Sequence, residues 1–440
     1  MKKHGTKKAR ETSRDLAIVT GFRTPFCKAG GALRGAAAAD LATHVFRELL
    51  DRTPIDPACV DEVILGCAGP DAREANVARV AALRAGLPQT TPAVTVMRNC
   101  GSGMEAVLQA QSRLRAGEGE VFLVGGTESM SNFPLLMGPQ LTAFFQRLGK
   151  AKTPLQRLRA MASFRVRALQ PRVAVVEGLT DPVTGLMMGH TAEKVAQRFR
   201  IDRAAMDAFA LRSHQLAAAA LQQGRLAAEV AALVPPPEHK TAVAQDDGIR
   251  TEQTLPALAK LRPVFDRDNG DVTVGNSCQV TDGAVALLCM STSRAQSLGL
   301  EPLAVVRGTA TAGLAPETMG LGPVHATPAA LQHAGLTLDD LDLVEINEAF
   351  AAQVLGCLRA FADDDYCRTE LGLDGALGEL DLDRVNVNGG AIALGHPIAA
   401  TGARLLLTLA HELRRRGARH GLATLCIGGG QGQAVVLEAA

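Results

Sequence analysis

The stretch that decides the fold is Asn386-Val-Asn-Gly-Gly-Ala-Ile-Ala-Leu-Gly-His-Pro-Ile-Ala-Ala-Thr-Gly-Ala-Arg404. A glycine-rich run precedes His396, and a helical pattern follows it from Thr401 to Leu409. Pro397 suits a first helical position, because the N–H that it lacks would have no partner there. We therefore expect His396 at a rigid corner between a strand and a helix. A capped helix with an incidental histidine is the simpler alternative.

Two further glycine-rich corners each carry a cysteine. The strand pattern Ala93–Met97 leads into Cys100, and a helical pattern follows. A helix N-terminus stabilises a thiolate, so we expect the pKa of Cys100 to lie below the ordinary value of about 8.5. Cys426 ends a strand and enters a run of three glycines, whose N–H groups suit a developing oxyanion. A cysteine at a strand end is usually only buried, but these corners together indicate nucleophilic catalysis.

A fourth corner lies at Glu345-Ile-Asn-Glu-Ala-Phe350, where a strand ends and a helix begins. The side-chain amide of Asn347 can hold a water molecule or a carbonyl oxygen. A helix cap is the alternative role for this residue.

Strands alternate with helices along the chain, which predicts an α/β fold with a parallel sheet covered on both faces. Leu16-Ala-Ile-Val19 recurs as Leu303-Ala-Val-Val306, and the order of the later elements recurs with it. We infer a duplication in which Cys100 and His396 occupy equivalent corners. The expected division is a disordered basic tail (1–14), an N-terminal half (15–130 with 262–297), an inserted loop domain (131–261) and a C-terminal half (298–440).

The inserted segment begins with an unusual distribution of charge. From Ser131 to Val176 there are eight basic residues and no acidic one, and apolar residues are interleaved with them. This is typical of a basic amphipathic segment. Three interpretations stand: a solvated face packed on the body, a contact with a membrane surface or partner subunit through residues 141–172, or attraction to the phosphates of a nucleotide-bearing substrate.

The composition of the chain bears on its partners and its location in the cell. A net charge of +1, no tryptophan and a single tyrosine, Tyr366, argue against nucleic acid as a partner. No apolar run approaches the roughly 18–20 residues that span a bilayer, and Met1–Asp15 lacks the apolar core of a secretory signal. Nine scattered cysteines without a Cys-x-x-Cys pair indicate reduced thiols and a cytoplasmic location.

Taken together, these blocks resemble the thiolase family. The resemblance runs from Leu16 to Glu438, and it rests on Cys100, Asn347-Glu-Ala-Phe350, Gly389-Gly-Ala-Ile-Ala-Leu-Gly-His-Pro397 and Cys426-Ile-Gly-Gly-Gly430. The basic insertion, Lys260–Arg267 and His411–Gly417 look like the β-subunit of fatty acid oxidation complexes. That subfamily commonly has histidine where Asn347 stands, and stand-alone thiolases have asparagine. The implied fold has five layers, α-β-α-β-α.

The resemblance also implies roles for individual residues. Cys100 would be the acylated nucleophile, His396 would activate it, and Cys426 would be the acid/base. His396 and Asn347, the latter through a water molecule, would form one oxyanion site, and the N–H groups of Cys100 and Gly428 the other. Coenzyme A, a substrate with no further cofactor, would lie on the inserted domain near Ser277 and Cys278.

The implied reaction is thiolysis of 3-ketoacyl-CoA to acetyl-CoA and a shortened acyl-CoA, in fatty acid β-oxidation. A biosynthetic thiolase that condenses two acetyl-CoA, and a non-catalytic acyl-CoA-binding protein, are the alternatives. The implied partners are a second copy in a homodimer or homotetramer, or a hydratase/dehydrogenase α-subunit.

Overall fold

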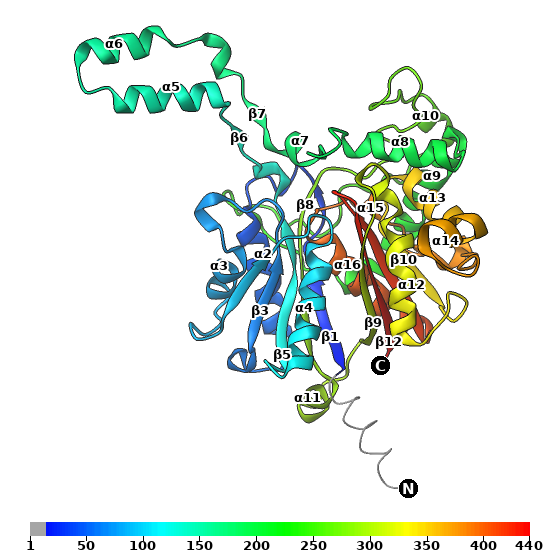
Figure 1. Cartoon of the computed structure of the whole chain (residues 1–440). Coiled ribbons are helices and arrows are strands. Elements are labelled where there is room, and N and C mark those ends of the chain that lie inside the picture. Colours follow the sequence, from blue (N-terminus) through cyan, green and yellow to red (C-terminus); the bar gives the residue numbers. More distant parts are fainter. Residues whose placement is uncertain (1–14) are drawn as a thin grey trace.

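A computed structural model describes residues 15–440 (Figure 1), so the tail expected at 1–14 lies outside the described residues. Most of the strands form one mixed sheet in the order β10-β11-β12-β9-β1-β8-β5-β3-β4, and β2 pairs with β8. Its strands are β1 (Leu16–Arg23), β2 (Cys27–Lys28), β3 (Glu62–Gly66), β4 (Ala93–Val96), β5 (Val121–Glu128), β8 (Thr281–Ser291), β9 (Ala304–Gly313), β10 (Leu343–Ile346), β11 (His420–Ile427) and β12 (Gln431–Ala439).

The expectation of a parallel sheet is wrong for its centre. Among the described strands, β3 is parallel to both β4 and β5, and β10 is parallel to β11, but the other pairs are antiparallel. The reason is connectivity. β8 enters between β1 and β5 after the long insertion, and β12 turns straight back from β11.

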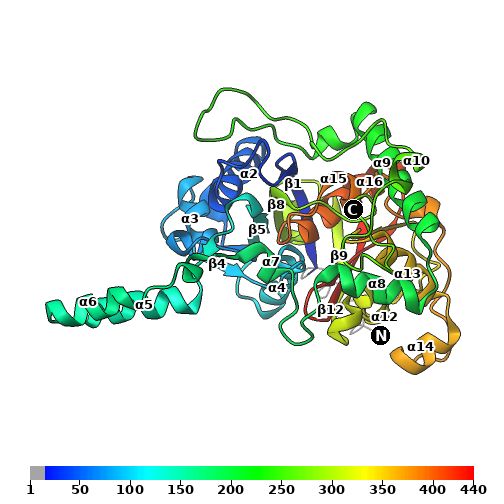
Figure 2. The same cartoon turned by 90° about the horizontal axis from the view of Figure 1, so that it is seen from above.

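The duplicated five-layer fold is confirmed. Helices α2 (Ala38–Arg52) and α3 (Val77–Arg84) cover the outer face of the N-terminal half, and α12 (Gly322–Ala334) covers that of the C-terminal half. Helices α4 (Ser102–Ala116) and α16 (Thr401–Arg416) pack on each other between the two halves of the sheet (Figures 1 and 2). A short antiparallel contact between β1 and β9 makes the sheet continuous.

Two glycines explain how the central helices come so close. A Cβ on Gly103 of α4 would lie 2.5 Å from the carbonyl oxygen of Ala399, and one on Gly402 of α16 would lie 2.7 Å from the backbone nitrogen of Met104. The helices therefore meet backbone to backbone at their N-terminal ends. Those ends carry the two corners that the sequence singled out.

The expectation that a strand leads into the His396 corner is wrong. Val385 bridges Val344 and Val387 bridges Gly389, but Asn386 between them has a φ of 48°, so this segment forms no regular strand. Helix α16 begins at Thr401, where the sequence pattern predicts it, and residues 397–400 form a turn between it and the short helix α15 (Ala391–Leu394). Residues Ala284–Met290 are part of strand β8.

The insertion divides into two parts. Helices α7 (Ala174–Gly178), α8 (Met188–Arg198), α9 (Arg203–Gln222) and α10 (Leu255–Ala259) lie over the body, where α8 and α9 contact α13 (Ala351–Phe361). Helices α5 (Pro139–Lys150) and α6 (Pro154–Ala162) project away from it on the ribbon of β6 (Leu135–Leu136) and β7 (Arg172–Val173) (Figure 1). The interpretation that the basic segment packs on the body is therefore wrong. The remaining α-helices are α11 (Thr292–Ser297) and α14 (Asp364–Leu371).

Candidate active site

The corner that holds Cys100 sits directly on the loop that follows Cys426. Cys100 lies between β4 and α4 and is partly exposed. The side-chain amide of Asn99 donates a hydrogen bond of 2.8 Å to the carbonyl oxygen of Gly428. A Cβ on Gly101 would lie 2.5 Å from Oε1 of Gln433 and 2.6 Å from Cδ1 of Ile427, so a larger residue would require these side chains to shift. The structure thus brings Cys100 and Gly428 together from opposite halves of the chain.

The thiol of Cys100 is not acidified by its position. Burial raises the pKa of Cys100, and hydrogen bonds from the backbone N–H of Gly428 and from its own N–H only partly oppose that rise. The expectation of a lowered pKa is therefore wrong, because desolvation outweighs the donors at the helix N-terminus. A neutral thiol at pH 7 needs a base to become a nucleophile.

His396 has the properties of that base. Its Nδ1 lies 2.6 Å from Oγ1 of Thr401, and the Thr401 hydroxyl donates to the carbonyl oxygen of Pro397. The hydroxyl proton is thus engaged, so Nδ1 must carry the imidazole proton and donate it to Oγ1. Nε2 is then an open acceptor, and it is buried without a hydrogen-bond partner in the described structure. Burial, with the charge of Arg404, lowers the pKa of His396 to about 4, so the ring is neutral.

Two more thiols lie close to Cys100. Cys426 is buried at the end of β11, and burial together with the negative charge of a Cys100 thiolate raises its pKa well above the ordinary value. Burial and Cys100 likewise raise the pKa of Cys278 to about 12. Charges act on one another in this way only at short range. Cys100, Cys278 and Cys426 therefore converge, although they come from distant parts of the sequence.

Asn347 presents an unfilled polar site. Its N–H donates to the carbonyl oxygen of Thr424, which fixes it between β10 and α13. Its side chain is fully buried, and neither Oδ1 nor Nδ2 has a hydrogen-bond partner in the described structure. Buried amides are nearly always satisfied, so this pair marks a place for a water molecule or a polar ligand atom. The alternative role of a helix cap is not observed, since Phe350 occupies the N-cap position of α13 and no side-chain capping hydrogen bond is present there.

Ser277 and Cys278, the two residues expected near coenzyme A, differ in their hydrogen bonds and in their exposure. The hydroxyl of Ser277 donates to the carbonyl oxygen of Thr273, and the residue is buried. Cys278 is partly exposed, and its N–H donates to the carbonyl oxygen of Ala349. Ser277 thus shapes the loop and Cys278 faces the cluster of thiols. Their contact with coenzyme A stays a prediction.

Sequence reasoning missed Glu128, at the end of β5. Its carboxylate accepts hydrogen bonds from the N–H groups of Ala68, Gly69 and Ala399, so it ties the turn after His396 to the N-terminal half. Burial raises the pKa of Glu128 to about 7. The available signal was an acidic residue at the end of a largely apolar, glycine-containing strand.

Met188, at the start of α8, was also missed. A Cβ on Gly428 would lie 3.2 Å from its sulfur atom, so the inserted segment reaches over the Cys426 loop. Two consecutive methionines before a helical pattern were the only sequence signal for it.

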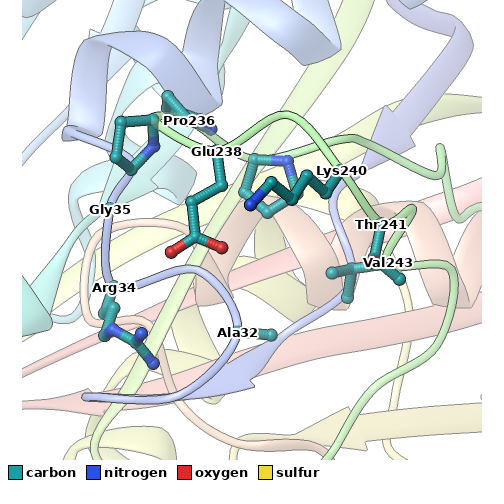
Figure 3. A pocket seen from close by; sticks show the side chains of 10 residues that line it. Ala32, Arg34, Gly35, Pro236, Glu238, Lys240, Thr241 and Val243 are labelled. Carbon is teal, nitrogen blue, oxygen red and sulfur yellow. The ribbon is translucent and has the colours of Figure 1, made fainter.

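Four surface pockets of the described residues are lined by none of the predicted site residues. A surface pocket of about 300 Å³ is lined by residues that include Arg34, Glu238 and Lys240 (Figure 3), and none of the predicted site residues lines it. Within residues 15–440, no group of three or more histidine, cysteine, aspartate and glutamate side chains could hold a metal ion. All nine cysteines are free thiols.

Comparisons with known proteins identify the family of the chain. The family model for the thiolase N-terminal domain matches residues 16–293, and the model for the C-terminal domain matches residues 300–439. The chain belongs to the thiolase family.

Individual relatives and solved structures are similar to this chain over nearly its full length. The chain is 43% identical to a 3-ketoacyl-CoA thiolase of Aeromonas salmonicida and 42% identical to one of Serratia proteamaculans, over 96% of each chain. The crystal structure of an acetyl-CoA acetyltransferase from Bacillus anthracis has a TM-score of 0.84 at 38% identity, and covers 97% of this chain and 99% of its own. Human mitochondrial 3-ketoacyl-CoA thiolase in complex with CoA has a TM-score of 0.83 at 36% identity, with 98% and 99% covered.

Proposed function

We propose that this protein is an acyltransferase that cleaves 3-ketoacyl-CoA with coenzyme A, in the cytoplasm and in fatty acid β-oxidation. The observation that carries the proposal is the meeting of the Cys100 corner with the Cys426–Gly428 loop. The matching corner of the other half supplies a neutral His396 whose Nε2 has no hydrogen-bond partner in the described structure. The names of the Aeromonas and Serratia relatives support 3-ketoacyl-CoA as the substrate.

The first half-reaction moves the acyl group to the enzyme. Nε2 of His396 takes the proton of Cys100, and the thiolate attacks the C3 carbonyl of the substrate. The bond between C2 and C3 breaks, and the acyl group stays on Cys100 as a thioester. The electron pair moves onto C2, which receives a proton from Cys426, and acetyl-CoA leaves.

The second half-reaction returns Cys100. The Cys426 thiolate takes the proton of the coenzyme A thiol. The sulfur of coenzyme A then attacks the acyl carbonyl and releases the Cys100 thiolate. Cys100 regains its proton from His396. Backbone N–H groups of Cys100 and Gly428 stabilise the oxyanion on the acyl group, since both already point at the Cys100 sulfur. The protonated Nε2 of His396, with Asn347 acting through a water molecule, stabilises the oxygen of the leaving acetyl-CoA enolate.

A single set of rate measurements distinguishes thiolysis from two other functions, condensation of acetyl-CoA and binding of acyl-CoA without catalysis. Condensation of two acetyl-CoA is favoured by the similarity to the Bacillus acetyl-CoA acetyltransferase. Thiolysis rates are to be measured across 3-ketoacyl-CoA chain lengths, beside the condensation of acetyl-CoA. We expect thiolysis of several chain lengths. Turnover of acetoacetyl-CoA alone would favour the condensing enzyme, and binding without any turnover would favour an acyl-CoA-binding protein.

We propose a homodimer formed through β4. This strand ends the sheet, pairs only with β3 among the described strands, and leaves its other edge open. An open strand edge is a template for pairing with another chain. A second copy fits it, because two β4 edges can extend the two sheets into one. Sedimentation should show a dimer, and a larger species would indicate the homotetramer. Association with a hydratase/dehydrogenase subunit requires a separate sedimentation experiment in which that subunit is mixed with this protein.

A further inference from the structure

One buried carboxylate, that of Glu348, joins three parts of the chain beside the candidate active site. Its side chain is fully buried just after the end of β10. Oε1 accepts a hydrogen bond of 2.9 Å from the side-chain amide of Asn386. Oε2 accepts from the hydroxyl of Ser213 at 2.6 Å and from the backbone N–H of Ile392 at 3.2 Å. The carboxylate therefore holds α9, α15 and the loop before α15 together.

The side chain of Asn386 replaces the strand pairing that its backbone does not make. With a φ of 48°, Asn386 interrupts the extended run beside β10. Its side-chain oxygen accepts from the N–H of Ile346, and its side-chain nitrogen donates to the carbonyl oxygen of Ile346, each at 2.8 Å. The same nitrogen is the donor to Glu348. Side-chain atoms therefore fix the start of the glycine-rich run to the end of β10.

Ser213 brings the inserted segment into the same arrangement. It lies on α9, and its hydroxyl donates to Glu348 while it accepts from the N–H of Gly390 at 3.2 Å. A Cβ on Gly389 would lie 2.5 Å from the carbonyl oxygen of Ser213. A Cβ on Gly390 would lie 2.3 Å from Cδ of Glu348. The two glycines therefore allow α9 and the carboxylate to approach the backbone that leads to His396.

The three partners of Glu348 suit an ionised carboxylate. All three are donors, and an ionised carboxylate only accepts hydrogen bonds. Burial raises the pKa of Glu348, and the hydrogen bonds from Ser213, Asn386 and Ile392 oppose that rise. A glutamine at this position would point its amide N–H at one or more of these donors. The chemistry of the carboxylate, and not only its shape, therefore holds the arrangement.

The hydrogen bonds of Glu348 connect the Asn347 corner with the His396 corner. Glu348 directly follows Asn347, so its anchoring limits where the unpartnered side-chain amide of Asn347 lies. On the other side, the N–H of Gly395 donates to the carbonyl oxygen of Ala391 in α15 at 2.8 Å, and His396 comes next. Because Asn347 and His396 belong to separate corners, the distance between them depends on what joins the corners.

We propose that Glu348 is a positioning residue that sets the separation of Asn347 and His396, and that Ser213 extends this control to the inserted segment. This role rests on the proposed function, in which Asn347 and His396 stabilise the oxygen of the acetyl-CoA enolate. A displacement of about 1 Å in such a site can cost about a hundredfold in rate. Glu348 is fully buried, so it acts through its neighbours and not on the substrate.

Two reactions of the same enzyme separate a positioning role from a merely structural one. Thiolysis of 3-ketoacyl-CoA breaks a carbon–carbon bond and passes through the enolate. Exchange of labelled coenzyme A into acetyl-CoA moves the acetyl group to Cys100 and back, and no enolate forms, because the leaving group and the returning nucleophile are both coenzyme A thiolates. A misplaced Asn347 therefore slows thiolysis more than exchange.

The test is to measure both rates in variants of the carboxylate and of its serine partner. Glu348→Gln should lower kcat for thiolysis by about a hundredfold and the exchange rate by less than about tenfold, with KM changed by less than about threefold. Ser213→Ala should lower the ratio of thiolysis to exchange by about tenfold. Ser213→Thr keeps the hydroxyl and should recover most of that ratio. If Glu348→Gln does not fold, the two serine variants give the test by themselves.

The matched control is Ser291→Ala. Ser291 is also buried and its hydroxyl accepts a backbone N–H, but it ends β8, whereas Thr281 at the start of that strand accepts the N–H of His396. This variant should keep the wild-type ratio. An equal fall of both rates in Glu348→Gln, or an unchanged ratio in Ser213→Ala, would overturn the proposal. A wild type that exchanges label but cleaves no 3-ketoacyl-CoA would contradict the proposed function instead. The ratio would then be measured with condensation of acetyl-CoA, which also passes through the enolate.

Discussion

The Cys100 corner and the His396 corner occupy the same place in the two halves, at the N-terminal ends of α4 and α16, yet they hold their side chains differently. Cys100 is partly exposed and receives backbone N–H groups. His396 is almost fully buried, is fixed at Nδ1 by Thr401, and leaves Nε2 open. The difference teaches that a duplicated corner can supply both partners of a proton transfer, the acid from one copy and the base from the other.

The largest expected effect comes from replacing Cys100, which is the acid of this proton transfer. Cys100→Ser keeps the shape of the corner but replaces the thiol with a far weaker acid, which a neutral imidazole of low pKa activates poorly. We expect kcat for thiolysis to fall by at least about 10⁴-fold, and no acyl-enzyme to be detected by intact-mass spectrometry. A loss of less than tenfold would remove Cys100 from the nucleophile's role.

The second thiol moves a proton in both half-reactions of thiolysis, but acylation by acetyl-CoA needs no proton on carbon. Cys426→Ala should still form the acetyl-enzyme on Cys100 from acetyl-CoA, because the nucleophile and its base are intact and the coenzyme A thiolate can leave without a proton. Turnover should fall by about 10³-fold, the typical loss when an acid/base is removed. Rapid-quench kinetics would show a single acylation followed by slow release. Full turnover in this variant would exclude Cys426 from proton transfer.

The buried imidazole should also be visible in stability. The pKa of His396 is lowered from 6.5 to about 4, so the unfolded chain takes up a proton in this range before the folded protein does. Stability from this group is therefore lost as pH falls from 6.5 to 4, by about 3 kcal/mol. Relative to His396→Gln, the unfolding free energy of the wild type should drop by that amount in denaturant titrations.

Glu128→Gln serves as the contrast, because the sign is opposite. The pKa of Glu128 is raised from 4.5 to about 7, so this carboxyl costs stability as pH rises through that range. The difference in unfolding free energy between the wild type and Glu128→Gln should become less favourable to the wild type as pH rises. The same slope in both comparisons would contradict the assigned environments.

The smallest expected effect concerns the orientation of the imidazole. Thr401→Val removes the acceptor for Nδ1–H while it keeps the shape of the side chain. We expect kcat to fall by about tenfold, because the tautomer with an open Nε2 is no longer selected. Thr401→Ser should restore most of the rate. An unchanged pH–rate profile in Thr401→Val would show that the hydroxyl does not hold the imidazole.

Local patterns were sufficient to single out Cys100, His396, Asn347 and Cys426, because each lies within a few residues of a strand end, a glycine-rich run or the start of a helix. The antiparallel centre of the sheet was not predictable in this way, since the direction of β8 depends on how a long insertion returns to the body. Glu128 was missed because its role comes from N–H groups far away in the sequence. The net pKa of Cys100 required knowledge of its burial.

The central claim is that Cys100, activated by His396, carries the acyl group. Its most direct test is to incubate the wild-type protein with acetyl-CoA in the absence of free coenzyme A, and to map the modified peptides by mass spectrometry. The account predicts an acetyl thioester on Cys100 that is removed by added coenzyme A. Acetylation of Cys278 or Cys426 with Cys100 unmodified, or no acetylated cysteine, would contradict it.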